Sequence, residues 1–111
     1  MYIYKIVNNV NNFVYVGLTT RAPEIRMQEH LRNSKKLNRR LYRAMRKYGT
    51  DNFEMVVIAK LKEIKNADVL YKLECDYIKA FNSYWFGYND TIGGRGVRQL
   101  KRGRKKQLKA F

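Results

Sequence analysis

The side chains best suited to chemistry are spread along this chain, and none of them is informative alone. Between them, these side chains can exchange protons, carry charge or bind a cation. Two are tyrosines in the tripeptides Tyr2-Ile3-Tyr4 and Tyr15-Val16-Gly17. The full set is Tyr4, Tyr15, Arg26, His30, Glu74 and Asn89. Hydrolysis of a phosphodiester needs an activated water, neutralised charge on the phosphoryl oxygens and a stabilised leaving oxygen. The set contains groups for each task and indicates a metal-dependent phosphodiesterase.

Glu74 stands out even without reference to a known protein. It lies between Leu70 and Ile78 on a stripe of apolar residues at helical spacing. A carboxylate there costs free energy unless it is paired or bound to a cation. One interpretation is a buried ion pair with Arg26 or a lysine. We favour a ligand for one Mg²⁺ or Mn²⁺ per active site, because such ions take one or two carboxylates and add water and substrate phosphate.

The charge of the chain indicates a polyanionic partner. Its 111 residues contain 24 Lys and Arg against 9 Asp and Glu, for a net charge of +15. One small domain with this surplus favours nucleic acid as the partner. A solubilising surface is the plainer alternative, but the basic residues are clustered, which favours binding.

The densest cluster falls on a predicted helix over residues 38–48, which ends at Gly49. One face carries Arg39, Arg40, Arg43, Arg46 and Lys47, and the apolar residues fall on the other face. No acidic residue occurs from Leu31 to Thr50. An ordinary solvated face mixes the two signs of charge, so we expect this face to contact DNA phosphates.

The remaining elements must position the chemical groups. Residues 2–7 and 13–18 predict an antiparallel hairpin around an asparagine-rich turn, with Tyr4 and Tyr15 near each other. Pro23 suits the first turn of a helix that runs to about residue 32. The apolar run at 53–59 predicts a buried central strand or one packed on both sides. A third helix is expected over about 66–81, and the aromatic segment 84–89 is expected to pack back on the sheet.

The C-terminal residues differ in composition from the rest. Eight basic residues and no acidic one occur between Arg95 and Lys109. We expect residues 1–94 to form the domain and 95–111 to form a flexible basic tail, since the tail has too few apolar groups to fold alone. Its expected DNA contacts are Arg95, Arg98, Lys101, Arg102, Arg104, Lys105 and Lys106.

Cysteine and hydropathy bear on the location of the protein. The single cysteine, Cys75, cannot form an internal disulfide. No apolar run approaches the length needed to span a membrane. The sequence therefore favours the cytoplasm and no membrane partner.

Taken together, these residues resemble the GIY-YIG nuclease family, in particular the catalytic domains of phage and intron-associated homing endonucleases. The resemblance covers residues 2 to about 94. Its elements recur in one order: Tyr2-Ile3-Tyr4, Tyr15-Val16-Gly17-Leu18-Thr19-Thr20-Arg21, Leu41-Tyr42-Arg43-Ala44, Tyr48-Gly49 with Asn52-Phe53, and Gly87-Tyr88-Asn89 with Gly93-Gly94. Tyr2 replaces a glycine of the first motif and Val16 an isoleucine of the second, and neither change removes a tyrosine.

The resemblance implies an α/β (α+β) fold, with a small three-stranded antiparallel sheet flanked by helices. It also implies that the protein hydrolyses DNA with one divalent metal ion. By similarity, Glu74 holds the metal, Tyr4 and Tyr15 lie at the nucleophile, Arg26 lies beside the scissile phosphate, and His30 and Asn89 lie near them. A tyrosine acts as a base only if cations lower its pKa or if it passes the proton onward. We expect Tyr4 to be the base, with His30 as relay or alternative base, and Asn89 to orient a group.

Two other functional classes fit the residues less well. A non-catalytic nucleic-acid-binding protein on the same scaffold is expected to have lost Glu74, Arg26 or a tyrosine. A basic structural protein has no reason to bury Glu74. We therefore expect a metal-dependent endodeoxyribonuclease, homing-like or of a stand-alone phage type that acts in the host cytoplasm. Its DNA specificity, its choice between nicking and double-strand cleavage, and a homodimer or transient dimer on DNA stay open.

Overall fold

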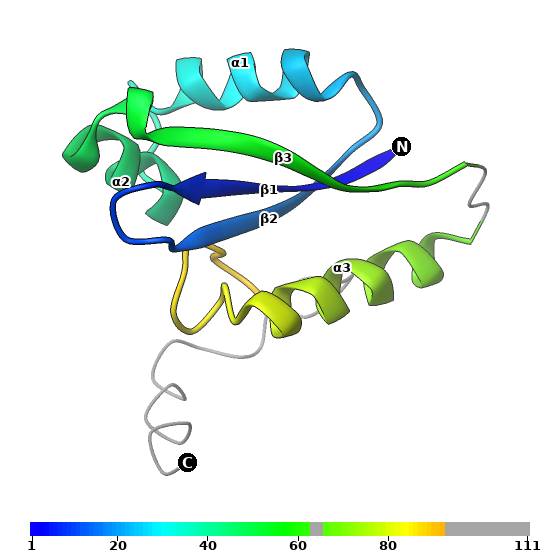
Figure 1. Ribbon diagram of the computed structural model, residues 1–111. Coiled ribbons are helices and arrows are strands. Elements are labelled where there is room, and N and C mark those ends of the chain that lie inside the picture. Colours follow the sequence, from blue (N-terminus) through cyan, green and yellow to red (C-terminus); the bar gives the residue numbers. More distant parts are fainter. Residues whose placement is uncertain (63–65, 93–111) are drawn as a thin grey trace, which may run out of the picture.

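Three antiparallel strands and three helices make up the structure, a computed structural model that describes residues 1–62 and 66–92. The strands are β1 (Tyr2–Asn8), β2 (Val14–Thr19) and β3 (Phe53–Lys60). The helices are α1 (Pro23–Asn33), α2 (Arg40–Tyr48) and α3 (Ala67–Phe81), with a short 3-10 turn at Thr50–Asn52. The predicted α+β fold is confirmed (Figure 1).

The β1–β2 hairpin forms as its sequence predicts. Val7 pairs with Val14 at the turn end, and the Phe13 carbonyl accepts a hydrogen bond from the Asn8 amide at 2.9 Å. Asn12 has a φ of 65°, in the left-handed region that asparagine tolerates. The turn sets the register that places Tyr4 opposite Gly17.

The predicted central position of β3 is wrong. The strand order is β2-β1-β3, so β1 is central and β3 lies at an edge, where Val56 and Val57 are exposed. The apolar residues of β3 are explained instead by packing on both faces of the strand. Phe53 and Met55 pack in one apolar cluster while Ile58 packs in the other. The expectation that this strand packs on both sides is therefore confirmed.

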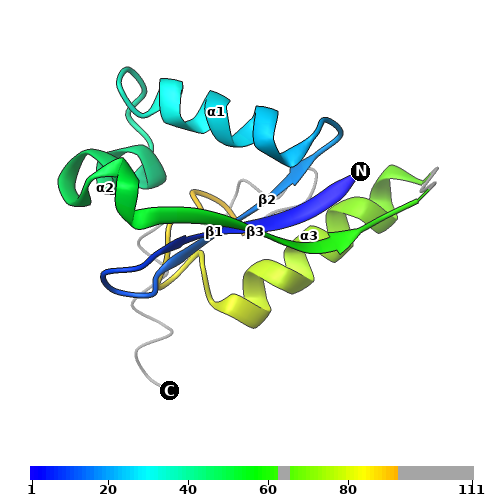
Figure 2. The ribbon, with the colours of Figure 1, turned by 45° about the horizontal axis from the view of Figure 1, so that its top comes forward.

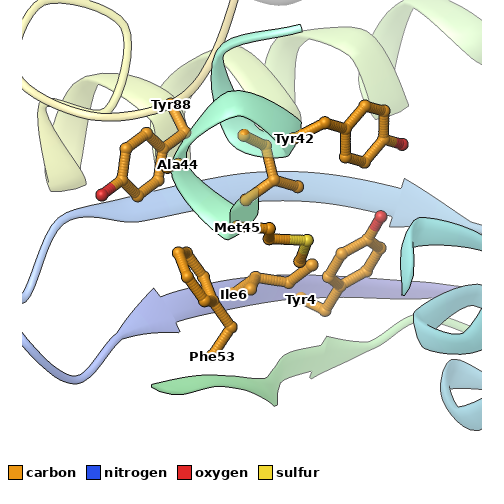
Figure 3. Close-up of a cluster of buried hydrophobic side chains, with 8 residues drawn as sticks. Tyr4, Ile6, Tyr42, Ala44, Met45, Phe53 and Tyr88 are labelled. Carbon is orange, nitrogen blue, oxygen red and sulfur yellow. The ribbon is translucent and has the colours of Figure 1, made fainter. Parts of the chain in front are cut away.

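Helices cover both faces of the sheet. Figures 1 and 2 show α1 and α3 on opposite sides of the strands, with α2 beyond one end of α1. Tyr4 and Ile6 of β1 pack with α2 in one cluster (Figure 3), and Ile3 packs with Ile78 of α3 in the other. The alternation of β1 thus assigns Tyr4 to the α2 side.

The segment after α3 returns to the sheet, as predicted. Asn82 ends α3 in a left-handed conformation. The Tyr88 amide then donates to the Val14 carbonyl at 2.9 Å. Gly87 is required by this approach, because a Cβ there would lie 2.5 Å from the same carbonyl oxygen.

The structure cannot be compared with the predictions for the C-terminal residues, and it bears on membrane-spanning helices only in the residues that it describes. The basic tail, 95–111, and the domain end at 94 lie outside them, so both stay predictions. Within residues 1–62 and 66–92, no helix has the length and apolar character that crossing a membrane requires.

Candidate active site

The end of the Tyr4 ring lies directly on the backbone of β2. A Cβ built on Gly17 would overlap Cζ and the hydroxyl of Tyr4, so only glycine allows this tyrosine to reach across the strand. The Tyr4 and Tyr15 rings are 6.3 Å apart between centroids, which confirms the expected proximity. Glycine in the second tripeptide therefore makes room for the tyrosine of the first.

His30 joins two tyrosines inside the protein. Its Nε2 lies 2.7 Å from the Tyr4 hydroxyl, and its Nδ1 lies 2.8 Å from the hydroxyl of Tyr42 on α2. The exposed fractions of Tyr4, His30 and Tyr42 are 0 %, 1 % and 6 %. Both ring nitrogens thus have hydroxyl partners on buried tyrosines.

A cavity of about 250 Å³ adjoins this group. Its lining includes the half-buried Tyr15 and Arg26, together with Tyr42, Arg39 and Asp90. The Tyr15 ring also lies 5.5 Å from the His30 ring, edge to face. The β1–β2 hairpin and α1 therefore bring Tyr4, Tyr15, Arg26 and His30 together, as the sequence predicts.

Arg26 is held by an acidic partner on its own helix. Its Nη1 lies 2.9 Å from Oε1 of Glu29, and Arg21 pairs with the same carboxylate. Burial opposes the charge of Arg26, but its hydrogen bonds to Glu29 and Tyr4 outweigh that effect and raise the pKa of the guanidinium. The hydrogen bond from Arg26 also lowers the pKa of Glu29.

Burial keeps the tyrosines and the histidine neutral. It raises the pKa of Tyr4 well above the usual range, despite the opposing charge and hydrogen bond of Arg26. It raises the pKa of Tyr15 to about 12 and, with the charge of Arg26, lowers the pKa of His30 to about 4. At neutral pH the hydrogen bond between Tyr4 and His30 therefore joins two uncharged groups.

Glu74 lies on α3, which packs against β2, and is half-buried. Its negative charge contributes to the raised pKa of Tyr15, as does that of Asp90. In the described part of the chain, no group of three or more His, Cys, Asp and Glu side chains could hold a metal ion. One carboxylate fits Mg²⁺ only where water and substrate phosphate complete the shell, so the role of Glu74 as a metal ligand stays a prediction.

Asn89 binds the backbone of the strand between the active-site residues. Its Oδ1 accepts from the Val16 amide and its Nδ2 donates to the Val16 carbonyl, both at 2.8 Å. The side chain thus pairs with the outer edge of β2 as a neighbouring strand does. This contact orients the backbone between Tyr15 and Gly17, and any direct part in catalysis stays a prediction.

The predicted cationic face of α2 divides into two groups. Arg39 and Lys47 are exposed, whereas Arg40 is half-buried and donates to the carbonyls of Tyr84 and Asn89 at 2.6 and 2.5 Å. Arg46 donates to the carbonyls of Ser34 and Leu37, and Arg43 to Asn38. Arg40 therefore ties the segment after α3 to α2, a use that the charge pattern did not predict.

The sequence prediction missed three residues at the site: Tyr42, Glu29 and Asp90. Tyr42 lies within the Leu41-Tyr42-Arg43-Ala44 element of the family resemblance, which was its only signal in the sequence. Glu29 stands three residues after Arg26 on α1, a spacing at which opposite charges pair. Asp90 directly follows Asn89 and carried no signal.

Comparison with known proteins identifies similar solved structures. A mutant of the catalytic domain of intron endonuclease I-TevI is 31% identical with a TM-score of 0.70, and the match covers 81% of this chain and 92% of that one. The catalytic domain of homing endonuclease I-TevI is 32% identical with a TM-score of 0.68, and the match covers 79% and 95% of the two chains.

Two curated relatives come from Invertebrate iridescent virus 6. Protein 146R, whose name describes an MSV199 domain, is 38% identical over 85 residues, and uncharacterized protein 019R is 32% identical over 94. The matches cover 74% and 84% of this chain but only 34% and 32% of those proteins, so the chain spans about a third of their length. The family described as the GIY-YIG catalytic domain matches residues 1–89, and the chain therefore belongs to the GIY-YIG family.

Proposed function

We propose that this domain is a DNA endonuclease that hydrolyses phosphodiester bonds with one divalent metal ion, Mg²⁺ or Mn²⁺, per active site. The observation that carries the proposal is the buried Tyr4–His30 hydrogen bond, which is linked through Tyr42 to a cavity that the half-buried Arg26 also lines. DNA binding alone does not require such a pair. The net charge of +15 suits a polyanionic substrate, and similarity to an intron and homing endonuclease supports the reaction class.

Arg26 is proposed to bind the scissile phosphate. A guanidinium has five N–H donors in a fixed plane. Glu29 accepts from Nη1 of Arg26 and holds the group at the wall of the cavity. The donors that remain can bind phosphoryl oxygens and stabilise the charge that grows on them.

Tyr4 is proposed as the base and His30 as its partner. Both nitrogens of His30 face tyrosine hydroxyls, so the imidazole exchanges protons through them and not directly with a water in the cavity. Tyr15 lines the cavity and is placed to orient the attacking water. Because burial raises the pKa of Tyr4, this tyrosine needs both nearby positive charge and an acceptor for its proton.

Glu74 is proposed to hold the metal ion. When bound, such an ion supplies positive charge for the phosphoryl and leaving oxygens. Glu74 is the acidic residue of α3 whose charge reaches Tyr15, whereas Asp76 on the same helix is exposed and pairs with Lys72. Asp76 therefore serves as a control for loss of one negative charge from α3.

The test is nicking of supercoiled plasmid with Mg²⁺, Mn²⁺ or a chelator. Glu74→Gln is expected to abolish cleavage and to leave folding and DNA binding near wild type, while Asp76→Asn cuts normally. Mg²⁺-dependent cleavage by Glu74→Gln would refute the metal assignment. A wild-type protein that binds DNA but nicks it with neither metal would point to the non-catalytic class. One active site cuts one strand at a time, so we propose that a double-strand break requires a dimer or sequential nicks.

A further inference from the structure

We infer that Tyr42 completes a proton relay that leads from Tyr4, through the two nitrogens of His30, to the cavity. Tyr42 is then a positioning residue, because it acts on the reaction through His30. The kinetic part of this inference rests on the proposed function, whereas its structural part, the tautomer of His30, does not.

The relay is continuous in the structure. The Tyr4 hydroxyl lies 2.7 Å from Nε2 of His30, and Nδ1 of His30 lies 2.8 Å from the Tyr42 hydroxyl. Both distances are within the ordinary range of hydrogen bonds. Tyr42 also lines the cavity, so the far end of the chain reaches the place proposed for substrate. In Figure 3 the hydroxyls of Tyr4 and Tyr42 lie toward one side of the cluster, and that of Tyr88 lies at the other.

The partners of Tyr4 fix the direction of the hydrogen bonds. A buried hydroxyl hydrogen needs an acceptor. Among the described residues the hydrogen-bond partner of this hydroxyl is Nε2 of His30, so the Tyr4 hydrogen points to that nitrogen. A neutral imidazole that accepts at Nε2 carries its hydrogen on Nδ1 and donates it to the Tyr42 oxygen.

This arrangement moves a proton without leaving a charge on His30. The Tyr4 O–H bond breaks as Nε2–H forms, and the Nδ1–H bond breaks as a bond to the Tyr42 oxygen forms. The original Tyr42 hydrogen passes to water in the cavity. His30 ends as the other neutral tautomer, and the tyrosinate left at Tyr4 accepts a proton from the attacking water.

The alternative is an imidazolium in the interior, which the surroundings disfavour. His30 is 1 % exposed and faces the positive charge of Arg26. Glu29 is the opposing negative charge, but it is paired with Arg21 and Arg26. A tautomer exchange through Tyr42 avoids this unfavourable state.

The first test reads the tautomer directly. His30 is the only histidine of the chain, so nitrogen NMR of the labelled full chain reports a single imidazole. The wild type is expected to show the Nδ1–H form in the absence of DNA and metal. Tyr42→Phe should shift the Nδ1 signal, because Nδ1–H loses its hydrogen-bond acceptor, and Tyr88→Phe should not. An Nε2–H form in the wild type, or unchanged signals in Tyr42→Phe, would overturn the inference.

The second test measures cleavage. Tyr42→Phe keeps the packed ring and should lower the single-turnover rate on the order of tenfold to a hundredfold, with DNA binding unchanged. Tyr88→Phe is the matched control, since it removes a hydroxyl that bonds Asn8 and Asn11 far from His30. Equal rates for Tyr42→Phe and wild type would overturn the relay. If the wild type cuts nothing, the proposed function fails, and the tautomer measurement alone decides the structural part.

Discussion

Tyr4 and His30 hold protonation states that their burial imposes. Removal from water raises the pKa of the phenol and lowers that of the imidazole to about 4, so the pair is neutral near pH 7. Direct transfer of the Tyr4 proton would create a buried tyrosinate and a buried imidazolium. If Tyr4 is the base, as proposed, the site therefore requires positive charge near Tyr4 and a route that carries the proton past His30.

The neutral state of His30 predicts a pH dependence of stability. Its pKa rises from about 4 in the folded protein to about 6.5 in the unfolded chain. The unfolded state thus binds the proton first as pH falls, and stability is lost between about pH 6.5 and pH 4. We expect His30 to account for a loss of about 2 kcal/mol between pH 7 and pH 4.5.

Urea unfolding at both pH values measures this effect. His30→Gln is the control, because it keeps every carboxylate and lacks the titrating imidazole. The variant should lose less stability than wild type on acidification. Equal losses would show that His30 is protonated in the folded state at pH 4.5.

The catalytic group predicts a contrast among side chains. Tyr4→Phe and Arg26→Ala should each lower the cleavage rate on the order of a hundredfold or more, because they remove the proposed proton-transfer group and the proposed phosphate-binding charge. Tyr71→Phe, on α3, should leave the rate unchanged. Single-turnover rates with saturating DNA distinguish these variants, and a normal rate for Tyr4→Phe would make Tyr4 a core residue.

At the scale of elements, the β1–β2 hairpin determines how Tyr4 meets His30. Gly17→Ala would place a methyl group against Cζ and the hydroxyl of Tyr4 and 2.9 Å from Cε2 of Tyr15. We expect a loss of stability of about 1–3 kcal/mol, as for overpacked cores, and displacement of Tyr4. Urea unfolding and the His30 NMR signals measure both, and wild-type values for both would contradict this account of Gly17.

Most elements could be predicted from local patterns. The hairpin followed from strand-forming residues around asparagines, and Pro23 marked the start of α1. Helix α3 follows the predicted stripe, with Asn66 capping its first turn by accepting from the Asp68 amide. Each of these features depends on residues that are neighbours in the sequence, so each can be predicted from the sequence alone.

The errors concern contacts between distant parts of the chain. The apolar run of β3 could not distinguish an edge strand that packs in two clusters from a central one. The charge pattern of α2 could not show that Arg40 bonds the carbonyls of Tyr84 and Asn89, 44 and 49 residues away. Tyr42 was missed at the site for the same reason, since its link to His30 exists only after α1 and α2 pack.

At the scale of the molecule, the net positive charge is expected to oppose binding of the proposed metal ion in the absence of DNA. A chain of net charge +15 with Glu74 as its proposed carboxylate ligand should bind Mn²⁺ weakly. Backbone phosphates supply both negative charge and ligands. We expect electron paramagnetic resonance to show tight Mn²⁺ binding only with duplex DNA. Glu74→Gln with the same duplex corrects for Mn²⁺ on DNA alone, and tight binding without DNA would contradict the prediction.

The basic segment after the described residues is predicted to supply affinity and not chemistry. Each phosphate that it neutralises should contribute roughly −0.9 to the log–log salt slope of binding to duplex DNA. Deleting residues 97–111 should weaken binding at low salt and make the slope shallower by several units. Turnover at saturating DNA and the positions of cleavage should stay the same, because phosphate contacts position a protein without specifying sequence. Affinity against salt and cleavage mapping test this; an unchanged slope or an altered pattern would mean that the segment is a recognition element.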